Sequence, residues 1–123
     1  MQQEPLYVAN RVVAIVLPST PFVEWINAAD PFPANTKITL DDARDEPSAF
    51  LIPTDSSDDP DQPGKRWIQR NWKAIFEHML GDWYIDPDLW PRNRTIRMFR
   101  EWCEIRLHPT VLDCAVTPLE YDD

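Results

Sequence analysis

Apolar residues recur every three or four positions along Lys65–Trp83, the longest periodic stretch of the chain. This spacing predicts an amphipathic helix with one buried face. Pro63 and Gly64 mark its beginning, and Gly81 is predicted to take the left-handed conformation that often caps a helix C-terminus. The apolar residues of this helix are Ile68, Trp72, Ile75, Phe76, Met79, Leu80 and Trp83.

The segment before this helix predicts a strand, a helix and two further short strands. Leu6–Leu17 contains the continuous apolar run Val12–Leu17, which is typical of a central strand, and Pro18 ends it. Ser19 or Thr20 is predicted to cap a helix that has Pro21 at its first position and stops by Asp30.

Between residues 37 and 64 the pattern is weaker. Lys37–Leu40 is predicted as a short strand, and Asp41–Glu46 as a helical turn or an exposed loop. Ala49–Ile52 is a second strand bounded by prolines, and the acidic stretch Thr54–Gly64 is predicted to be a loop.

After an irregular Asp82–Pro91 segment, Asn93 or Thr95 is predicted to cap a helix that runs to about Trp102. Residues 103–108 then alternate between apolar and polar, as in a strand, although a helix through His108 also fits. Val111–Leu112 is predicted to pair with that strand, which would bring Cys103 and Cys114 face to face.

The order strand, helix, strand, strand, helix, helix, strand predicts one α+β domain over residues 1–123. We expect a mostly antiparallel sheet with helices on one face, in a ferredoxin-like arrangement. A three-layer α/β sandwich is the rival architecture.

The segment Leu89-Trp90-Pro91, Asn93-Arg94-Thr95, Phe99 and Glu101-Trp102 resembles a group of small bacterial proteins of no known function. Those proteins carry Trp-Pro-x-Asn-Arg-Thr, an aromatic helix and a short strand that ends near an aspartate, here Asp113. A weaker likeness lies at residues 50–53. The resemblance implies a bacterial cytoplasmic protein and the helix-then-strand order, and it transfers no activity.

The net charge is −9, and it is unevenly distributed. Residues 1–64 carry −8, residues 65–106 carry +3 and residues 107–123 carry −4. This acidity argues against general nucleic-acid or membrane binding. Without a basic leader or a long apolar run, and with two cysteines, the chain is predicted to be cytoplasmic with reduced thiols.

The sequence contains no recognisable catalytic, metal or cofactor motif. His78, Cys103, His108 and Cys114 lack metal-ligand spacing, and the acidic loop from Asp55 does not fit a calcium-binding loop. We therefore predict no metal and no cofactor. An enzyme with a small polar site around His108 is the second hypothesis for function.

Nucleic-acid binding is the third hypothesis. Arg66, Arg70 and Lys73 lie on the polar face of the long helix near Trp67, and Arg94, Arg97 and Arg100 follow on the next helix. Arginines beside exposed aromatic residues can bind single strands.

The leading hypothesis is a non-catalytic protein-binding module, of the inhibitor or immunity type, that masks a basic partner protein. The acidic segments 41–46 and 55–61 would dock the partner, and six tryptophans predict that one or two are exposed at the interface. The predicted partner-binding residues are Asp41, Asp42, Asp58, Asp59, Trp67 and Trp90.

Overall fold

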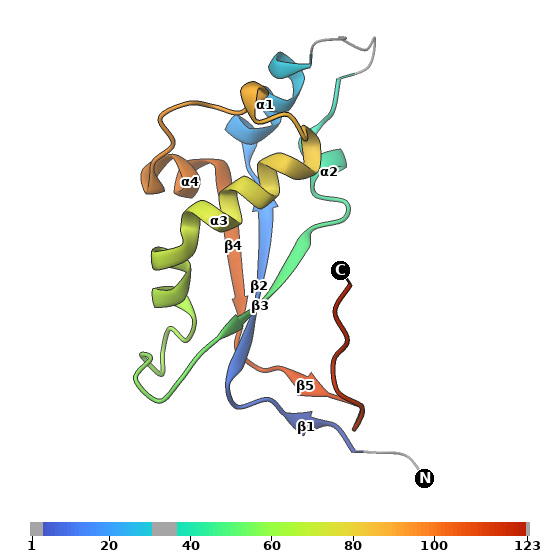
Figure 1. Cartoon of the computed structure of the whole chain (residues 1–123), viewed down its shortest axis with the longest axis vertical. Helices are drawn as coiled ribbons and strands as arrows, with labels where there is room; N and C mark the ends of the chain where they lie inside the picture. The colour runs from blue at the N-terminus through green and yellow to red at the C-terminus, as the bar shows by residue number, and fades with distance from the viewer. Residues whose placement is uncertain (1–3, 31–36, 123) are drawn as a thin grey trace.

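Strand β2 (Arg11–Pro18) is the centre of a three-stranded antiparallel sheet with the order β3-β2-β4 (Figure 1). The computed structural model describes residues 4–30 and 37–122. β3 (Ser48–Pro53) and β4 (Cys103–His108) flank β2, and both Leu51 and His108 lie opposite Val13. This arrangement confirms the predicted central strand, the strand at 49–52 and the change from helix to strand at residue 103.

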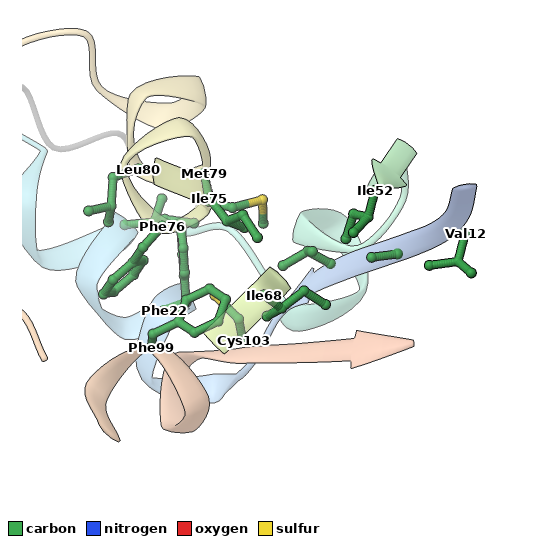
Figure 2. Packing of buried hydrophobic residues seen from close by; sticks show 13 residues of the cluster. Val12, Phe22, Ile52, Ile68, Ile75, Phe76, Met79, Leu80, Phe99 and Cys103 are labelled. Carbon is green, nitrogen blue, oxygen red and sulfur yellow. The ribbon is translucent and has the colours of Figure 1, made fainter. Parts of the chain in front are cut away.

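The helices α1 (Thr20–Ala29), α3 (Lys65–Trp83) and α4 (Ile96–Trp102) pack on one face of this sheet. The sheet presents alternate side chains to them, because neighbouring residues of a strand point to opposite faces. Figure 2 shows the resulting core. Its members are Val12, Ala14, Val16, Ile52 and Cys103 from the sheet, and Phe22, Ile26, Ile68, Ile75, Phe76, Met79, Leu80 and Phe99 from the helices.

The predicted helix boundaries are confirmed, with one correction. α1 follows Ser19 and carries a proline in its first turn, and the Thr95 side chain accepts a hydrogen bond from the Met98 N–H at the start of α4. Gly81 is not a left-handed cap, because α3 continues through it to Trp83. The left-handed glycine is Gly64, which precedes α3 with φ 87°.

The predicted strand at Lys37–Leu40 is wrong. Leu40 begins the short helix α2 (Leu40–Ala43), and Thr39 and Asp42 form a reciprocal capping box at its start. Two hydrogen bonds of 2.9 Å join the Asn27 side-chain amide to the Ile38 backbone. A side chain of α1 therefore takes the backbone groups that a neighbouring strand would otherwise pair.

The predicted strand from Leu6 to Leu17 is divided by a bend at Ala9 and Asn10. Its first part, β1 (Leu6–Tyr7), pairs with β5 (Leu112–Asp113) in a separate two-stranded ribbon. The prediction that 111–112 pairs with 103–108 is therefore wrong. Cys103 is buried and Cys114 is exposed, so the two thiols do not face each other.

The α+β class with an antiparallel sheet is confirmed, whereas the ferredoxin-like arrangement is not. Only three strands form the main sheet within the described residues, and both neighbours of β2 are antiparallel to it. Among the described helices, α1, α3 and α4 pack on one face, and only the four-residue α2, whose following residue Arg44 pairs with Glu104, comes near the other, so no second helical layer forms a three-layer sandwich there. The segment Asp82–Pro91, predicted to be irregular, is so only from Tyr84 onward and contains the 3₁₀ turn η1 (Pro87–Leu89), because Asp82 and Trp83 belong to α3. None of the described helices has the length and hydropathy of a membrane span.

Candidate functional site

A groove of about 390 Å³ opens between α2, the start of β3 and the last turn of α3. Four carboxylates line it, from Asp42, Asp45, Glu46 and Asp82, and none of its described lining residues is lysine or arginine. Met79 and Trp83, one turn apart on α3, contribute apolar surface. We call this feature the acidic groove.

The packing of α3 near the start of β3 brings distant parts of the sequence together at the acidic groove. The Ser48 hydroxyl donates to Asp82 Oδ2 over 3.5 Å, although 34 residues separate them in the chain. His78 Nε2 lies 3.5 Å from the same oxygen, one helical turn away. Sequence reasoning did not assign Asp82 to the binding site, because no local pattern links it to segment 41–46.

Asp42 combines a structural role with its place in the groove. Its Oδ2 accepts a hydrogen bond of 3.0 Å from the Thr39 N–H, and its own N–H donates to Thr39 Oγ1 over 3.1 Å. The backbone hydrogen bond from Thr39, followed by the Thr39 side chain, lowers the pKa of the Asp42 carboxyl. Asp42 is therefore negatively charged at neutral pH, as an acidic docking site requires. Asp41 is exposed on the same short helix but does not line the groove.

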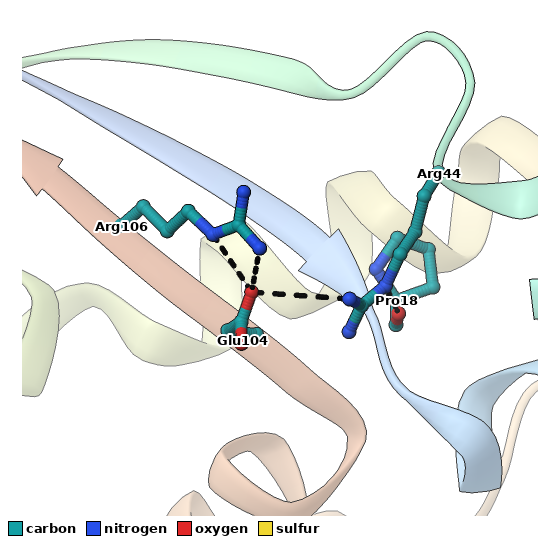
Figure 3. A network of polar contacts seen from close by, with 4 residues as sticks. All are labelled: Pro18, Arg44, Glu104 and Arg106. Carbon is teal, nitrogen blue, oxygen red and sulfur yellow. Dashed lines mark hydrogen bonds and ion pairs between the residues drawn. The ribbon is translucent and has the colours of Figure 1, made fainter. Parts of the chain in front are cut away.

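Arg44 lies between Asp42 and Asp45 in the sequence, but its guanidinium interacts with other residues, outside the acidic groove (Figure 3). Its Nε–H donates to the Pro18 carbonyl over 2.7 Å, and its Nη1 lies 3.9 Å from Glu104 Oε2. The same oxygen accepts from Arg106 Nε over 2.9 Å. Arg44 is thus held by the end of β2 and by β4, and it does not line the acidic groove.

The second predicted acidic segment, 55–61, lies at the other end of α3. This helix has 19 residues with a kink at Asn71, so its two ends lie at most roughly 27 Å apart at ~1.5 Å per residue. Asp59 Oδ1 accepts from the Asp61 N–H over 2.9 Å, and Asp58 Oδ2 from the Gly64 N–H over 3.4 Å. The structure does not bring Asp58 and Asp59 together with Asp41 and Asp42.

The carboxylates of this loop are also matched by nearby cations. Asp58 lines two shallow hollows, one with Arg66 and Arg70 and the other with Lys65 and Arg66. Hydrogen bonds from the Ser57 hydroxyl, and then from its N–H, lower the pKa of Asp55, with a smaller contribution from Arg66. The negative charge of this loop is therefore partly neutralised by neighbouring cations, whereas the described lining of the acidic groove includes none.

The prediction that Trp67 and Trp90 are exposed is wrong, because both are partly buried against the core. The Trp90 indole N–H donates to the Tyr84 carbonyl over 2.7 Å, and the Arg94 guanidinium lies 5.7 Å from the Trp90 ring centroid. The other four tryptophans also pack against the core. Aromatic content alone could not separate core tryptophans from interface tryptophans.

Neither histidine lies in a described pocket with other polar side chains that could form an active site. His108 is exposed at the end of β4 and lines neither the acidic groove nor the hollows beside the 55–61 loop. His78 is exposed on α3 and contacts the Phe50 ring edge-on at 5.4 Å between centroids. Within the described segments, no group of three or more His, Cys, Asp or Glu side chains is placed to hold a metal ion.

Two of the arginines proposed for nucleic-acid binding are paired with acidic groups, and two more lie beside carboxylates. Arg94 Nη2 lies 2.9 Å from Glu77 Oε1, and Arg97 Nε lies 3.2 Å from Glu101 Oε1. Arg66 and Arg70 share their hollow with Asp55 and Asp58. The structure thus gives neither the nucleic-acid hypothesis nor the His108 enzyme hypothesis a specific observation in its favour.

No protein-family model, curated protein or solved structure matches the chain. The resemblance of residues 89–102 to small bacterial proteins therefore stays a prediction.

Proposed function

We propose that this protein is a non-catalytic binding module whose acidic groove receives lysine or arginine side chains of a basic partner protein. The observation that carries the proposal is the set of four groove carboxylates, from Asp42, Asp45, Glu46 and Asp82, with no basic residue among the described lining. An inhibitor or immunity-type protein that masks a basic surface would use such a site. The unpaired thiols favour action in a reducing compartment such as the cytoplasm.

The dimensions and chemistry of the groove suit a long basic side chain. Its volume of about 390 Å³ accommodates one or two such side chains. The apolar stem of a lysine or arginine would lie along Met79 and Trp83, while its charged end meets the carboxylates. Near a protein surface, each charge pair at 4 Å contributes up to about 4 kcal/mol before desolvation is subtracted.

A defined probe tests the proposal. We would titrate the full chain with a short amidated Lys/Arg peptide and follow backbone amides and the Trp83 indole N–H by NMR. The peptide should shift signals of segment 42–48 and of Asp82 and Trp83. The double variant Asp45→Asn/Glu46→Gln should weaken binding by roughly tenfold or more, since both carboxylates line the groove.

The matched control is Asp58→Asn/Asp59→Asn, which removes the same number of charges from the loop at the other end of α3. It should change the affinity by less than about twofold once salt screens long-range attraction. Equal losses in the two variants would show that only net charge matters, and would overturn the groove assignment. An unchanged affinity in the groove variant would overturn it as well. A pull-down comparing the wild type with the groove variant would then identify natural partners.

A further inference from the structure

A second surface lies on the side of the molecule formed by β4, away from the acidic groove. β4 is an edge strand, because the main sheet order ends with it and its described partner is β2 alone. A hollow of about 220 Å³ opens beside it, with an apolar lining that includes Ile68, Trp72, Ile105 and Leu107. Lys65 and Arg100 also line it, and none of its described lining residues is acidic. We call it the β4-edge hollow.

The alternation along β4 prepares this edge for one more strand. Ile105 and Leu107 are partly buried on the hollow side, whereas Glu104, Arg106 and His108 are exposed on the opposite face. A segment added along the free edge would place every second side chain in the hollow and the others beside Arg106. Its backbone would satisfy the unpaired edge of β4.

The C-terminal segment 114–122 has the complementary pattern. It is exposed throughout, with Val116 81% exposed, Leu119 62% and Tyr121 84%. Leu119 and Tyr121 are two residues apart and would lie on the same face of a strand. Glu120, between them, would lie on the other face. Asp122 would lie on that other face too, so the acidic residues of the segment would face the side of β4 that carries Arg106, and the segment has no basic residue.

We propose that segment 114–122 of a second copy of this chain adds to β4 as a strand, with Leu119 and Tyr121 in the β4-edge hollow. Pairing these two residues with Ile105 and Leu107, in either strand direction, puts Glu120 next to Arg106. The added segment is expected to come from a second copy of the chain. Within one chain, segment 114–122 lies on the β3 side of the sheet, whereas β4 lies on the opposite side of β2 (Figure 1). Reciprocal exchange of the two segments makes a closed two-fold dimer.

The test is the mass of the full chain in solution, measured by sedimentation equilibrium up to about 1 mM, the range of weak association. The wild type should approach twice the 14.4 kDa of one chain. Leu119→Asp should remain monomeric, because it places a carboxylate in the apolar hollow. Glu120→Lys should weaken the dimer by roughly fivefold, because it reverses the charge that the pairing puts next to Arg106, and salt should weaken the wild type.

The matched control is Val116→Asp, which also removes an exposed apolar residue but lies on the opposite face of the added strand. It should dimerise as the wild type does. Circular dichroism should show that all variants fold, since each changed residue is exposed. A wild type that stays monomeric, equal losses in Leu119→Asp and Val116→Asp, or contacts between Leu119 and Ile105 of the same chain would overturn the proposal. The acidic groove shares no lining residue with this hollow, so the two proposals can fail separately.

Discussion

Gly64 lies so close to Val12 that a Cβ atom on Gly64 would be 2.6 Å from Val12 Cγ2. The contact joins the start of α3 to the central strand, and it occurs where the backbone has a φ of 87°. Two physical requirements therefore meet at this position. A side chain has no room there, and L-residues other than glycine rarely take this conformation.

Gly64→Ala should destabilise the fold by about 2–4 kcal/mol, which combines the left-handed backbone cost with overpacking against β2. Urea unfolding followed by circular dichroism measures the loss. The control is Gly81→Ala, because Gly81 is helical and an added Cβ would meet Trp90 Cζ2 at an ordinary 3.5 Å. That variant should gain about 0.5–1 kcal/mol. Similar losses in both variants would contradict this account.

Arg94→Ala should cost about 1.5–3 kcal/mol, because its partly buried guanidinium bonds Glu77 and also donates to the Pro91 carbonyl over 3.0 Å. Its side chain is 21% exposed, whereas that of Arg97, which pairs with Glu101, is 89% exposed. Arg97→Ala should change stability by less than about 0.5 kcal/mol. Thermal unfolding of the two variants gives the comparison, and equal shifts in Tm would show that burial does not set the difference.

Burial raises the pKa of the Cys103 thiol to about 12, from an ordinary value of 9.0. Because the folded pKa is the higher one, the associated stability is complete below pH 9 and is lost as the pH rises towards 12. One such group contributes a slope of up to about 1.4 kcal/mol per pH unit. The measurement is urea unfolding at several pH values between about 8 and 10.5, on both sides of the ordinary thiol pKa. The free energy of unfolding should fall less steeply with pH in Cys103→Ala than in the wild type.

A thiol reagent provides an independent check. Exposed Cys114 should react at once, whereas Cys103 should react only when the protein unfolds. Burial, and then the charge of Asp30, raise the pKa of Tyr84. Its titration therefore also lowers the free energy of unfolding at high pH, equally in the wild type and in Cys103→Ala. An identical pH dependence in Cys103→Ala and the wild type would contradict the prediction.

Much of the fold could be predicted because the sequence signals were local. The period of 65–83, the cap at Thr95 and the alternation of 103–108 each depend on neighbouring residues, and the structure confirms all three. The errors occurred where a distant group decided the outcome. Ile38 bonds the side chain of Asn27, and Leu6–Tyr7 pairs with Leu112–Asp113 across almost the whole chain.

The candidate site could be predicted only in part, for the same reason. Segment 41–46 stood out by composition, but its partner Asp82 is brought to it by tertiary packing alone. Composition also gave equal weight to 55–61, because it could not show that Asp58 and Asp59 accept hydrogen bonds from their own loop. The expected exposure of Trp67 and Trp90 was wrong because tryptophan suits both cores and interfaces.

The central position of β2 also determines when the main sheet can form during synthesis. During synthesis β2 emerges early, yet its two neighbours are β3 and the much later β4. Until residues 103–108 are made, one edge of the most apolar strand has no partner. Non-local pairing of this kind slows folding and exposes intermediates to aggregation. A nascent chain that stops before β4 therefore leaves one edge of β2 unpaired, and residues 103–108 cover that edge in the finished chain.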